Sequence, residues 1–584
     1  MKKNVLSNPE NGALAILVLA YAGAFFLFPT EPDSAQYASI AREMAEGASW
    51  LRVQHRGQPY LDKPPWLFWM GAVFFKIFGA HAFAWRLSGL PALIILWFQG
   101  SIFFRNWGIS YTISHFLRLA CFLTPAFWLM FMDLRCELWL TAFCLLAWNT
   151  GAAWLREASK PDLWYSGLGF CGALLSKGMV GAMLIIPGWV AYAFFQKISL
   201  KRLSALCLAA LFVGAVGTLP FVWGLWKDFG TEGPAFYFWY QSFGRITGEN
   251  FWNNHPDPFF LWHSAMWAWA PISAGGLGMV IWKIRSGKET LWHPAGLLMT
   301  MLFLTLFSFS RYQLPHYIFP IAPWAALSLG PWLEKPEKPW RPWVFFVVAT
   351  GLFLGTVTML CFLFWREMIF FRKILCILTA FGIPFSLSLR TRLKFSLKTL
   401  AIFWGALSPA LASWVFFPTL GNFDAGKQIG NYVENYGNRP LLTYRWSSHQ
   451  LDFLLKTTVP VFDNSNSLIH AIHYRLAAHP QGLWLAIPEK EWLKINYQLS
   501  KIFFCTVCKQ FPYFRTTRLT KTFLLPESRP SALQNLLLIF IRNGNSGNKP
   551  SQGSIHATIF NFLHSGCIPD LCLSFLHSGI LVVG

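Results

Sequence analysis

Charged residues are scarce in this chain of 584 residues, where they make up 13% of the sequence against 54% for apolar residues. An average soluble domain has roughly a quarter of its residues charged. The chain also carries 31 Trp, 57 Phe and 35 Pro, a composition unlike that of a disordered protein, a coiled coil or a collagen. These features exclude a soluble globular protein and leave a polytopic membrane protein.

Acidic residues are scarcer than basic ones, at 26 against 48, so the formal net charge is +22. In a soluble protein this excess would suggest binding to nucleic acid. In a membrane protein, Lys and Arg instead collect on cytoplasmic loops close to anionic lipid. We therefore expect the excess positive charge to interact with membrane lipids, and we expect no nucleic acid partner.

Cysteine is also sparse, and the eleven residues lie mainly in apolar stretches. Their odd number and their scatter predict no disulfide framework. Cys505 and Cys508 form a close pair, but a zinc site would need a second pair at matching spacing. We expect this pair to be inert or casually oxidised.

Thirteen apolar stretches are long enough to cross about 30 Å of hydrocarbon. The first follows Lys2 and Lys3 and has no small-residue cleavage pattern, so we expect an uncleaved span. With the N-terminus in the cytoplasm the short basic loops all fall inside, and an odd number of spans places the C-terminus outside. The predicted spans are 13–28, 84–104, 112–131, 136–154, 163–176, 178–196, 203–226, 259–282, 291–310, 315–333, 342–365, 369–389 and 398–417.

This topology divides the chain into a transmembrane domain over 1–417 and a small external α/β domain over 418–525. Beyond that, residues 526–584 lose periodicity, and we assign this tail no structure or role. Within the first domain, the loops 30–82 and 227–258 and the turn at 311–317 face outward. Their polar residues are the candidates for function.

The loop 30–82 holds two of these candidates. Asp33 precedes a segment with the periodicity of an interfacial helix, 37–44, where its carboxylate could be a general base or simply the N-cap of that helix. Lys63 stands before Pro64 and Pro65, where the chain re-enters the membrane. An ammonium held at that level suits a lipid phosphate, although a snorkelling lysine is the alternative.

The turn Phe309–Pro320 is a further signal, because irregular backbone at membrane depth is tolerated where it lines a cavity. Arg311 could clamp a phosphate through two hydrogen bonds, and His316 and Tyr317 could donate to the same group. Lys177 lies at another outer boundary, and Arg245 lies in the loop 227–258.

Taken together, these motifs resemble the bacterial family of polyprenyl-phosphate-sugar glycosyltransferases. That family includes the aminoarabinose transferase acting on lipid A and the bacterial relatives of protein O-mannosyltransferases. The likeness covers roughly residues 10–420. It is carried by Asp33 with Tyr37, by Tyr60–Pro65 (YLDKPP), by Leu175–Gly178 (LSKG) and by Phe309–Tyr317 with its Leu-Pro-His-Tyr ending.

The resemblance implies an all-α polytopic fold of the GT-C type, with about thirteen transmembrane helices and a C-terminal external α/β domain. It implies a multi-pass protein of the bacterial inner membrane, with its active site and C-terminal domain in the periplasm. The donor would be a polyprenyl-phosphate-linked sugar, so no nucleotide-binding domain is expected. The acceptor would be lipid A or a protein.

The resemblance also implies roles for individual residues. Asp33 would be catalytic. Lys63, Arg245, Arg311 and Tyr317 would bind the lipid phosphate of the donor, with Tyr37, Tyr60, Lys177 and His316 in supporting roles. No cofactor is required, and a divalent metal is left open at Asp62, which matches an acidic residue of some relatives but could equally pair with a cation.

The chain departs from the family pattern at Ser34, Gln36, Gln241 and Gln313, where an acidic residue or a cation is usual. We expect the reaction class to be kept, while the sugar and the acceptor stay open. Two rivals from other classes are a multi-span transporter and an assembly protein whose outer domain binds a partner. A transporter should show two related halves with broken helices, and the sequence shows no such repetition.

Overall fold

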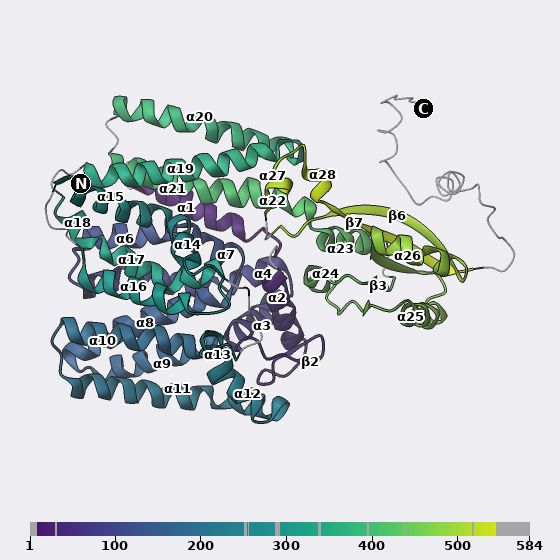
Figure 1. Ribbon diagram of the computed structural model, residues 1–584, viewed down its shortest axis with the longest axis horizontal. Helices are drawn as coiled ribbons and strands as arrows, with labels where there is room; N and C mark the ends of the chain where they lie inside the picture. Colours follow the sequence, from purple (N-terminus) through teal and green to yellow (C-terminus); the bar gives the residue numbers. More distant parts are fainter. Residues whose placement is uncertain are drawn as a thin grey trace.

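The computed structural model describes residues 9–29, 32–249, 254, 256–286, 292–336, 340–393, 396–436, 439–516 and 519–544. A large helical domain lies beside a smaller domain that contains strands, shown on the right in Figure 1. The predicted fold class, an all-α membrane domain followed by an α/β domain, is confirmed.

Apolar helices that lie side by side build the helical domain (Figure 1). Its core is continuous and rich in aromatic residues, with Trp85, Trp189 and Trp324 fully buried. The longer helices are α1 (Pro9–Ala24), α5 (Leu90–Asn106), α6 (Tyr111–Leu123), α8 (Cys136–Glu157), α9 (Lys160–Lys177), α10 (Met179–Phe195), α11 (Leu200–Phe229), α15 (Ala270–Ser286), α16 (Pro294–Ser308), α19 (Arg341–Leu363), α20 (Phe370–Leu393) and α21 (Leu397–Leu411).

The predicted count of thirteen spans is not confirmed. Among the described residues, six helical segments are long and apolar enough to cross a membrane, or up to eight if each bent pair is one span. The predicted spans 112–131 and 259–282 are bent by 55° and 104°. The predicted span 315–333 is divided into η3 (Pro315–Ile321), α17 (Ala322–Ser328) and α18 (Gly330–Glu334). Four prolines in that stretch remove backbone donors and interrupt a regular helix.

The smaller domain is built on a five-stranded sheet in the order β4-β3-β5-β7-β6. The first three strands are parallel, and β7 and β6 are antiparallel to their neighbours. Helices α23 (Ala425–Asn435) and α24 (His449–Leu454) cover one face, and α25 (Ser465–Ala478) and α26 (Glu489–Ser500) cover the other. The strands are β3 (Leu441–Tyr444), β4 (Val461–Phe462), β5 (Leu483–Pro488), β6 (Phe503–Tyr513) and β7 (Gln534–Asn543).

Strand β7 lies beyond the boundary that the sequence predicts at 525, and it pairs with both β5 and β6. The sheet therefore extends to residue 543. The segment Leu536–Ile539 is buried, and a strand covered on both faces reads as a continuous apolar run without alternation. That is why its sequence lacks the expected strand period. Residues 545–584, the rest of the predicted tail, lie outside the described part of the chain.

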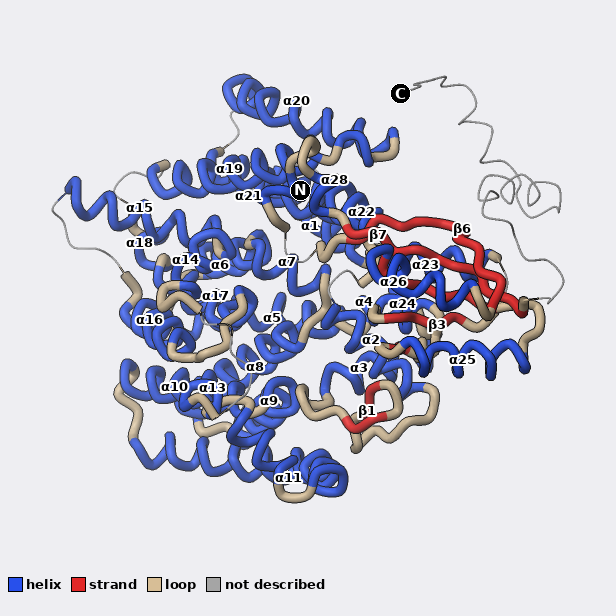
Figure 2. The backbone as a smooth tube through the Cα atoms, turned by 45° about the vertical axis from the view of Figure 1, so that its right-hand side comes forward, coloured by secondary structure: helices blue, strands red, loops and turns tan. Residues whose placement is uncertain are grey.

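The loop 30–82 is ordered into α2 (Pro32–Ala45), a small ribbon of β1 (Gln54–His55) and β2 (Gln58–Pro59), and α3 (Trp66–Phe78). Figure 2 shows the five-stranded sheet on the side of the helical domain where α2 and α3 lie. Helix α2 begins at Pro32, so Asp33 stands inside its first turn and is not its N-cap.

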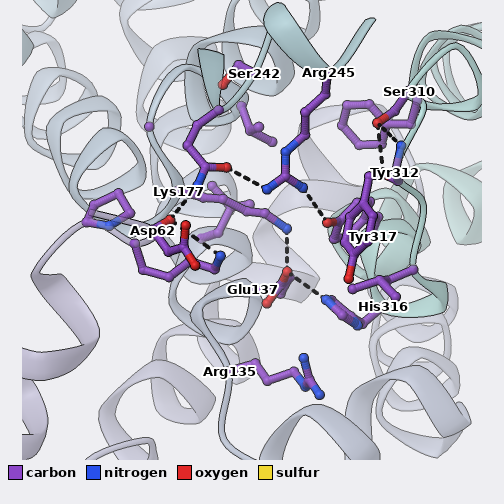
Figure 3. A pocket seen from close by; sticks show the side chains of 18 of the residues that line it. Asp62, Arg135, Glu137, Lys177, Ser242, Arg245, Ser310, Tyr312, His316 and Tyr317 are labelled. Carbon is purple, nitrogen blue, oxygen red and sulfur yellow. Dashed lines mark hydrogen bonds and ion pairs between the residues drawn. The ribbon is translucent and has the colours of Figure 1, made fainter. Parts of the chain in front are cut away.

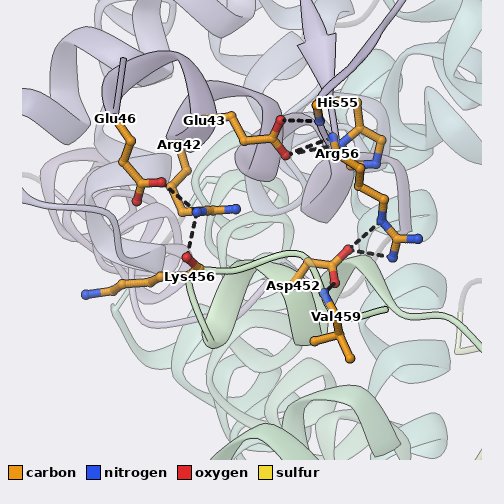
Figure 4. A network of polar contacts seen from close by, with 9 residues as sticks. Arg42, Glu43, Glu46, His55, Arg56, Asp452, Lys456 and Val459 are labelled. Carbon is orange, nitrogen blue, oxygen red and sulfur yellow. Dashed lines mark hydrogen bonds and ion pairs between the residues drawn. The ribbon is translucent and has the colours of Figure 1, made fainter. Parts of the chain in front are cut away.

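An ion pair and a hydrogen bond fasten this loop to the smaller domain, as Figure 4 shows. The Arg56 guanidinium donates to Asp452 Oδ2 from Nε at 2.9 Å and from NH2 at 2.6 Å. Arg42 donates to the carbonyl oxygen of Lys456 at 2.7 Å. A second attachment joins Arg529 to Glu367 in η4 (Trp365–Glu367), the short turn that follows α19. The α/β domain is thus held at two places, and we call the first of them the docking junction.

Candidate functional site

The helical domain contains a cavity of about 180 Å³ (Figure 3). The elements around it are α2, the segment that leads into α3, the first turn of α8, the end of α9, α13 (Gly244–Thr247) and η3. Segments far apart in the chain therefore meet in one place. The residues that the sequence proposes and that line the cavity are Asp33, Tyr37, Tyr60, Asp62, Lys63, Lys177, Arg245, His316 and Tyr317.

Arg245 is held by neutral partners. Its guanidinium donates to the hydroxyl oxygen of Tyr317 at 2.7 Å and to Gln241 Oε1 at 2.6 Å. In the described part of the chain no carboxylate forms an ion pair with it. Both partners fix the direction of the guanidinium and leave its positive charge uncompensated, which suits an anionic ligand.

Lys63 enters the cavity from the Tyr60–Pro65 segment. Pro65 directly precedes α3, so the rigid proline pair sets the position of the lysine. The ammonium donates to the main-chain oxygen of Asp62 at 3.4 Å, and Gln241 donates to the same oxygen at 2.8 Å. Burial, together with the nearby Asp62 carboxylate, raises the pKa of the Tyr60 phenol above its usual range, so that hydroxyl remains a donor.

Asp33 meets a cation that the sequence analysis does not name. Arg135, the residue before α8, donates from NH1 to Asp33 Oδ2 at 3.0 Å. The Arg135 side chain is buried, whereas that of Asp33 is 45% exposed. The guanidinium therefore anchors a carboxylate that still faces the cavity.

Glu137 occupies the first turn of α8, and its side chain is only 6% exposed. It forms an ion pair with Lys177 at the end of α9, and its Oε1 lies 3.4 Å from His316 Nε2 (Figure 3). The Lys177 ammonium also lies 4.2 Å from the centroid of the Tyr317 ring. Helices α8 and α9 and the turn η3 thus converge on one buried carboxylate.

Arg311 is the predicted site residue that the structure does not bring to the cavity. Its side chain is exposed and lies against Gly248. Its backbone N–H donates to the carbonyl oxygen of Arg245 at 2.9 Å. The turn at 309–314 is therefore tied to α13 by its backbone, and Arg245 is the guanidinium that faces the cavity.

The departures from the family pattern fall into two groups. Gln36 and Gln241 line the cavity. Ser34 is buried and accepts a hydrogen bond from Trp85 Nε1 at 3.1 Å. Gln313 is buried and closes its own turn by donating to the carbonyl oxygens of Ser308 and Ser310. Gln313 therefore does not line the cavity.

The described residues contain no group of three or more His, Cys, Asp or Glu side chains that could hold a metal ion. Asp62 lines the cavity with a single carboxylate, and divalent cations take several oxygen ligands. A metal at Asp62 stays a prediction.

Sequence reasoning missed Arg135 and Glu137. The signal was present, because Asp133 and Arg135 lie between the predicted spans 112–131 and 136–154, and Glu137 is the second residue of the later span. Ionisable residues at the edge of membrane segments are functional candidates by default.

Fold and cavity together define a multi-span membrane protein whose polar residues converge on one site suited to an anion. The fold is that of ArnT from Cupriavidus metallidurans. The structure of that protein bound to undecaprenyl phosphate gives a TM-score of 0.69 at 16% identity, covering 92% of this chain and 98% of that one. Its apo state gives 0.67 at 17% identity, covering 90% and 97%.

In sequence, the chain is similar to undecaprenyl phosphate-alpha-4-amino-4-deoxy-L-arabinose arabinosyl transferase 2 of Pseudomonas fluorescens, with 26% identity over 356 residues, or 56% of each protein. The corresponding transferase of Pseudomonas aeruginosa is 26% identical over 347 residues, which is 54% of this chain and 58% of that protein. The chain thus spans little more than half the length of these relatives, and no family model matches it. The resemblance indicated by the motifs is confirmed.

Proposed function

We propose that this protein is an integral membrane glycosyltransferase that moves a sugar from a polyprenyl-phosphate donor to an acceptor in the bacterial envelope. Lipid A is the first acceptor to test, and a protein is the second. An aminopentose is the first sugar to test, because the similar proteins are named for one. The enzyme would lie in the inner membrane with its cavity and its α/β domain on the periplasmic side.

The observation that carries this proposal is the uncompensated charge of Arg245. Its hydrogen-bond partners, Tyr317 and Gln241, are neutral. The cavity lining holds four cationic and three carboxylate side chains, so the excess is positive. A phosphate bearing a lipid chain would satisfy this charge in a medium of low dielectric.

In the proposed reaction an acceptor oxygen attacks the anomeric carbon of the donor sugar. The bond between that carbon and the phosphate oxygen breaks, and its electron pair stays on the polyprenyl phosphate. Lys63, Arg245 and the Tyr317 hydroxyl would stabilise the charge that develops there. Preorganised donors aimed at developing charge are usually the largest single contribution to catalysis.

The role of Asp33 depends on the acceptor. If the acceptor is a hydroxyl group, Asp33 would take its proton as the general base. If the acceptor is an ionised phosphate of lipid A, no proton is removed and Asp33 would orient the sugar. Arg135 would hold the carboxylate in place in either case.

The test is mass spectrometry of lipid A and of envelope proteins from cells that contain a polyprenyl-phosphate sugar and express either the wild type or Asp33→Asn. A sugar-sized mass added to one fraction by the wild type alone would establish both the activity and the acceptor. Asp463→Asn, an exposed carboxylate in the α/β domain, is the matched control and should behave as the wild type. No added mass in either fraction, with protein well expressed, would reject the proposal.

A further inference from the structure

Glu137 has no place in the proposed reaction, yet it is the most deeply buried carboxylate of the cavity. Its side chain is 6% exposed, against 45% for Asp33. It forms an ion pair with Lys177, whose side chain is 16% exposed, and lies close to His316. A charge buried this deeply is costly unless a partner compensates it. Glu137 and Lys177 therefore compensate each other.

Lys177 lies close to the proposed phosphate site. Its ammonium is 4.2 Å from the centroid of the Tyr317 ring, and the hydroxyl of the same tyrosine accepts a hydrogen bond from Arg245. Figure 3 shows Lys177 pointing toward Glu137. Lysine is a compact charge on a flexible stem with three donors. Without Glu137, the ammonium would be free to turn toward an anion bound at Arg245.

We propose that Glu137 is a positioning residue that keeps the Lys177 ammonium away from the lipid phosphate, and so limits how tightly the cavity holds the polyprenyl phosphate left after transfer. The inference rests on the proposed function. Product release often limits turnover. An interaction that binds the product polyprenyl phosphate as strongly as it binds the transition state does not speed the chemical step. The cavity then uses Lys63 and Arg245 for the phosphate and withholds Lys177.

The simpler alternative is that the ion pair only fastens α8 to α9. The two explanations predict opposite results when the carboxylate is neutralised. A purely structural pair predicts lower stability and weaker or unchanged phosphate binding. A counter-charge predicts tighter phosphate binding, because the released ammonium adds a charge-assisted hydrogen bond.

The experiment compares the wild type with Glu137→Gln, which keeps the size of the side chain and removes its charge. Binding of undecaprenyl phosphate to the purified full chain is measured beside binding of undecaprenol, which lacks the phosphate. We expect Glu137→Gln to bind undecaprenyl phosphate about tenfold more tightly and undecaprenol unchanged. In the transfer assay kcat and KM for the donor should fall together, which leaves kcat/KM nearly unchanged.

The double variant Glu137→Gln/Lys177→Met is a second test, because it removes both charges of the pair and leaves no buried carboxylate uncompensated. If Lys177 is withheld from the phosphate in the wild type, the double variant should bind undecaprenyl phosphate as the wild type does and lose the gain of Glu137→Gln. A tenfold loss of affinity in the double variant relative to the wild type would make Lys177 a phosphate ligand and overturn the inference.

The outcomes separate this inference from the function on which it rests. If the wild type binds undecaprenyl phosphate no more tightly than undecaprenol, the proposed donor site is wrong. If the wild type prefers the phosphate but Glu137→Gln gains no affinity, the donor site stands and the counter-charge role of Glu137 is wrong.

Discussion

The cavity and the docking junction are built from the same kinds of residue, but they use charge differently. At the junction Arg56 donates to a carboxylate, and Arg529 does the same at the second attachment. In the cavity Arg245 and Lys63 donate to neutral oxygens. Compensated charge fastens one element to another. Uncompensated charge that lines a cavity is what an anionic ligand can use.

The comparison is sharpest between two arginines. Arg245 faces the cavity with its charge uncompensated, whereas Arg311 is exposed against Gly248. We expect Arg245→Gln to lower transfer by ~10²-fold, as does removal of one donor to developing charge in other enzymes. Arg311→Gln should retain nearly full activity. The check is the rate of sugar transfer by both variants at equal expression, and equal losses would place Arg311 in the site after all.

The docking junction is tested by Asp452→Asn. The Asp452 residue is 1% exposed and accepts from Arg56 as well as from the backbone N–H of Val459. Removing its charge leaves the Arg56 guanidinium without its partner, and we expect a loss of about 2 kcal/mol. Hydrogen exchange over α24 should speed up, while exchange in α8 stays slow. Unchanged protection of α24 would mean that other contacts hold the junction.

The junction should also weaken in acid. Burial lowers the pKa of His55 to about 3, helped by His449, Arg56 and Arg42, and the rings of His55 and His449 lie 5.0 Å apart. A released His55 would titrate near 6.5. The contribution of His55 to the stability of the docking junction is therefore fully present above about pH 6.5 and is lost as the pH falls toward 3. At pH 5 this loss amounts to ~2 kcal/mol.

Hydrogen exchange over β1 and α24 between pH 7.5 and pH 5, corrected for the intrinsic pH dependence of exchange, measures this decline. His55→Gln should flatten the profile, since an amide does not titrate. An identical pH profile in the variant would show that His55 does not cause the pH dependence.

The smallest effect is expected on the surface. Glu491 accepts from Arg445 at 3.0 Å and from Lys494 at 2.5 Å, and both cations are about half exposed or more. Exposed ion pairs of this kind contribute little because water and salt screen them. Glu491→Gln should leave the unfolding of the α/β domain unchanged within error. A clear destabilisation would show that an exposed ion pair can stabilise the domain as a buried one does.

Much of the fold follows from the sequence because apolar length and loop charge are local properties. Each predicted span falls on helical structure, and the change of character after Phe417 precedes the α/β domain. The break at Thr124 also has a local cause, since the residue before Pro125 is disfavoured in the helical region and the Thr124 side chain caps the helix that follows. The 104° bend at Trp269 has no such signal directly beside it. Strand β7 was missed because its segment, buried on both faces, carries no period of two.

The candidate site was predictable where a motif is local. Tyr60–Pro65 and the end of the Phe309–Tyr317 turn both reach the cavity. Arg135 and Glu137 pair with Asp33 and Lys177, which lie 102 and 40 residues away in the sequence. Their position at the edge of a predicted span marks them as candidates, but no local pattern identifies their partners. The side chain of Arg311 lies outside the cavity lining, because the direction of a side chain in a turn is set by its tertiary surroundings, which the sequence does not show.

The central claim is that this cavity transfers a sugar from a lipid phosphate. Its most direct test incubates the purified chain with undecaprenyl-phosphate aminoarabinose and lipid A and measures the mass of the recovered lipid A. We predict one added aminopentose with the wild type and with Arg311→Gln, and none with Asp33→Asn. No added sugar on lipid A, nor on envelope protein supplied in its place, from a folded wild type that binds undecaprenyl phosphate would contradict the account.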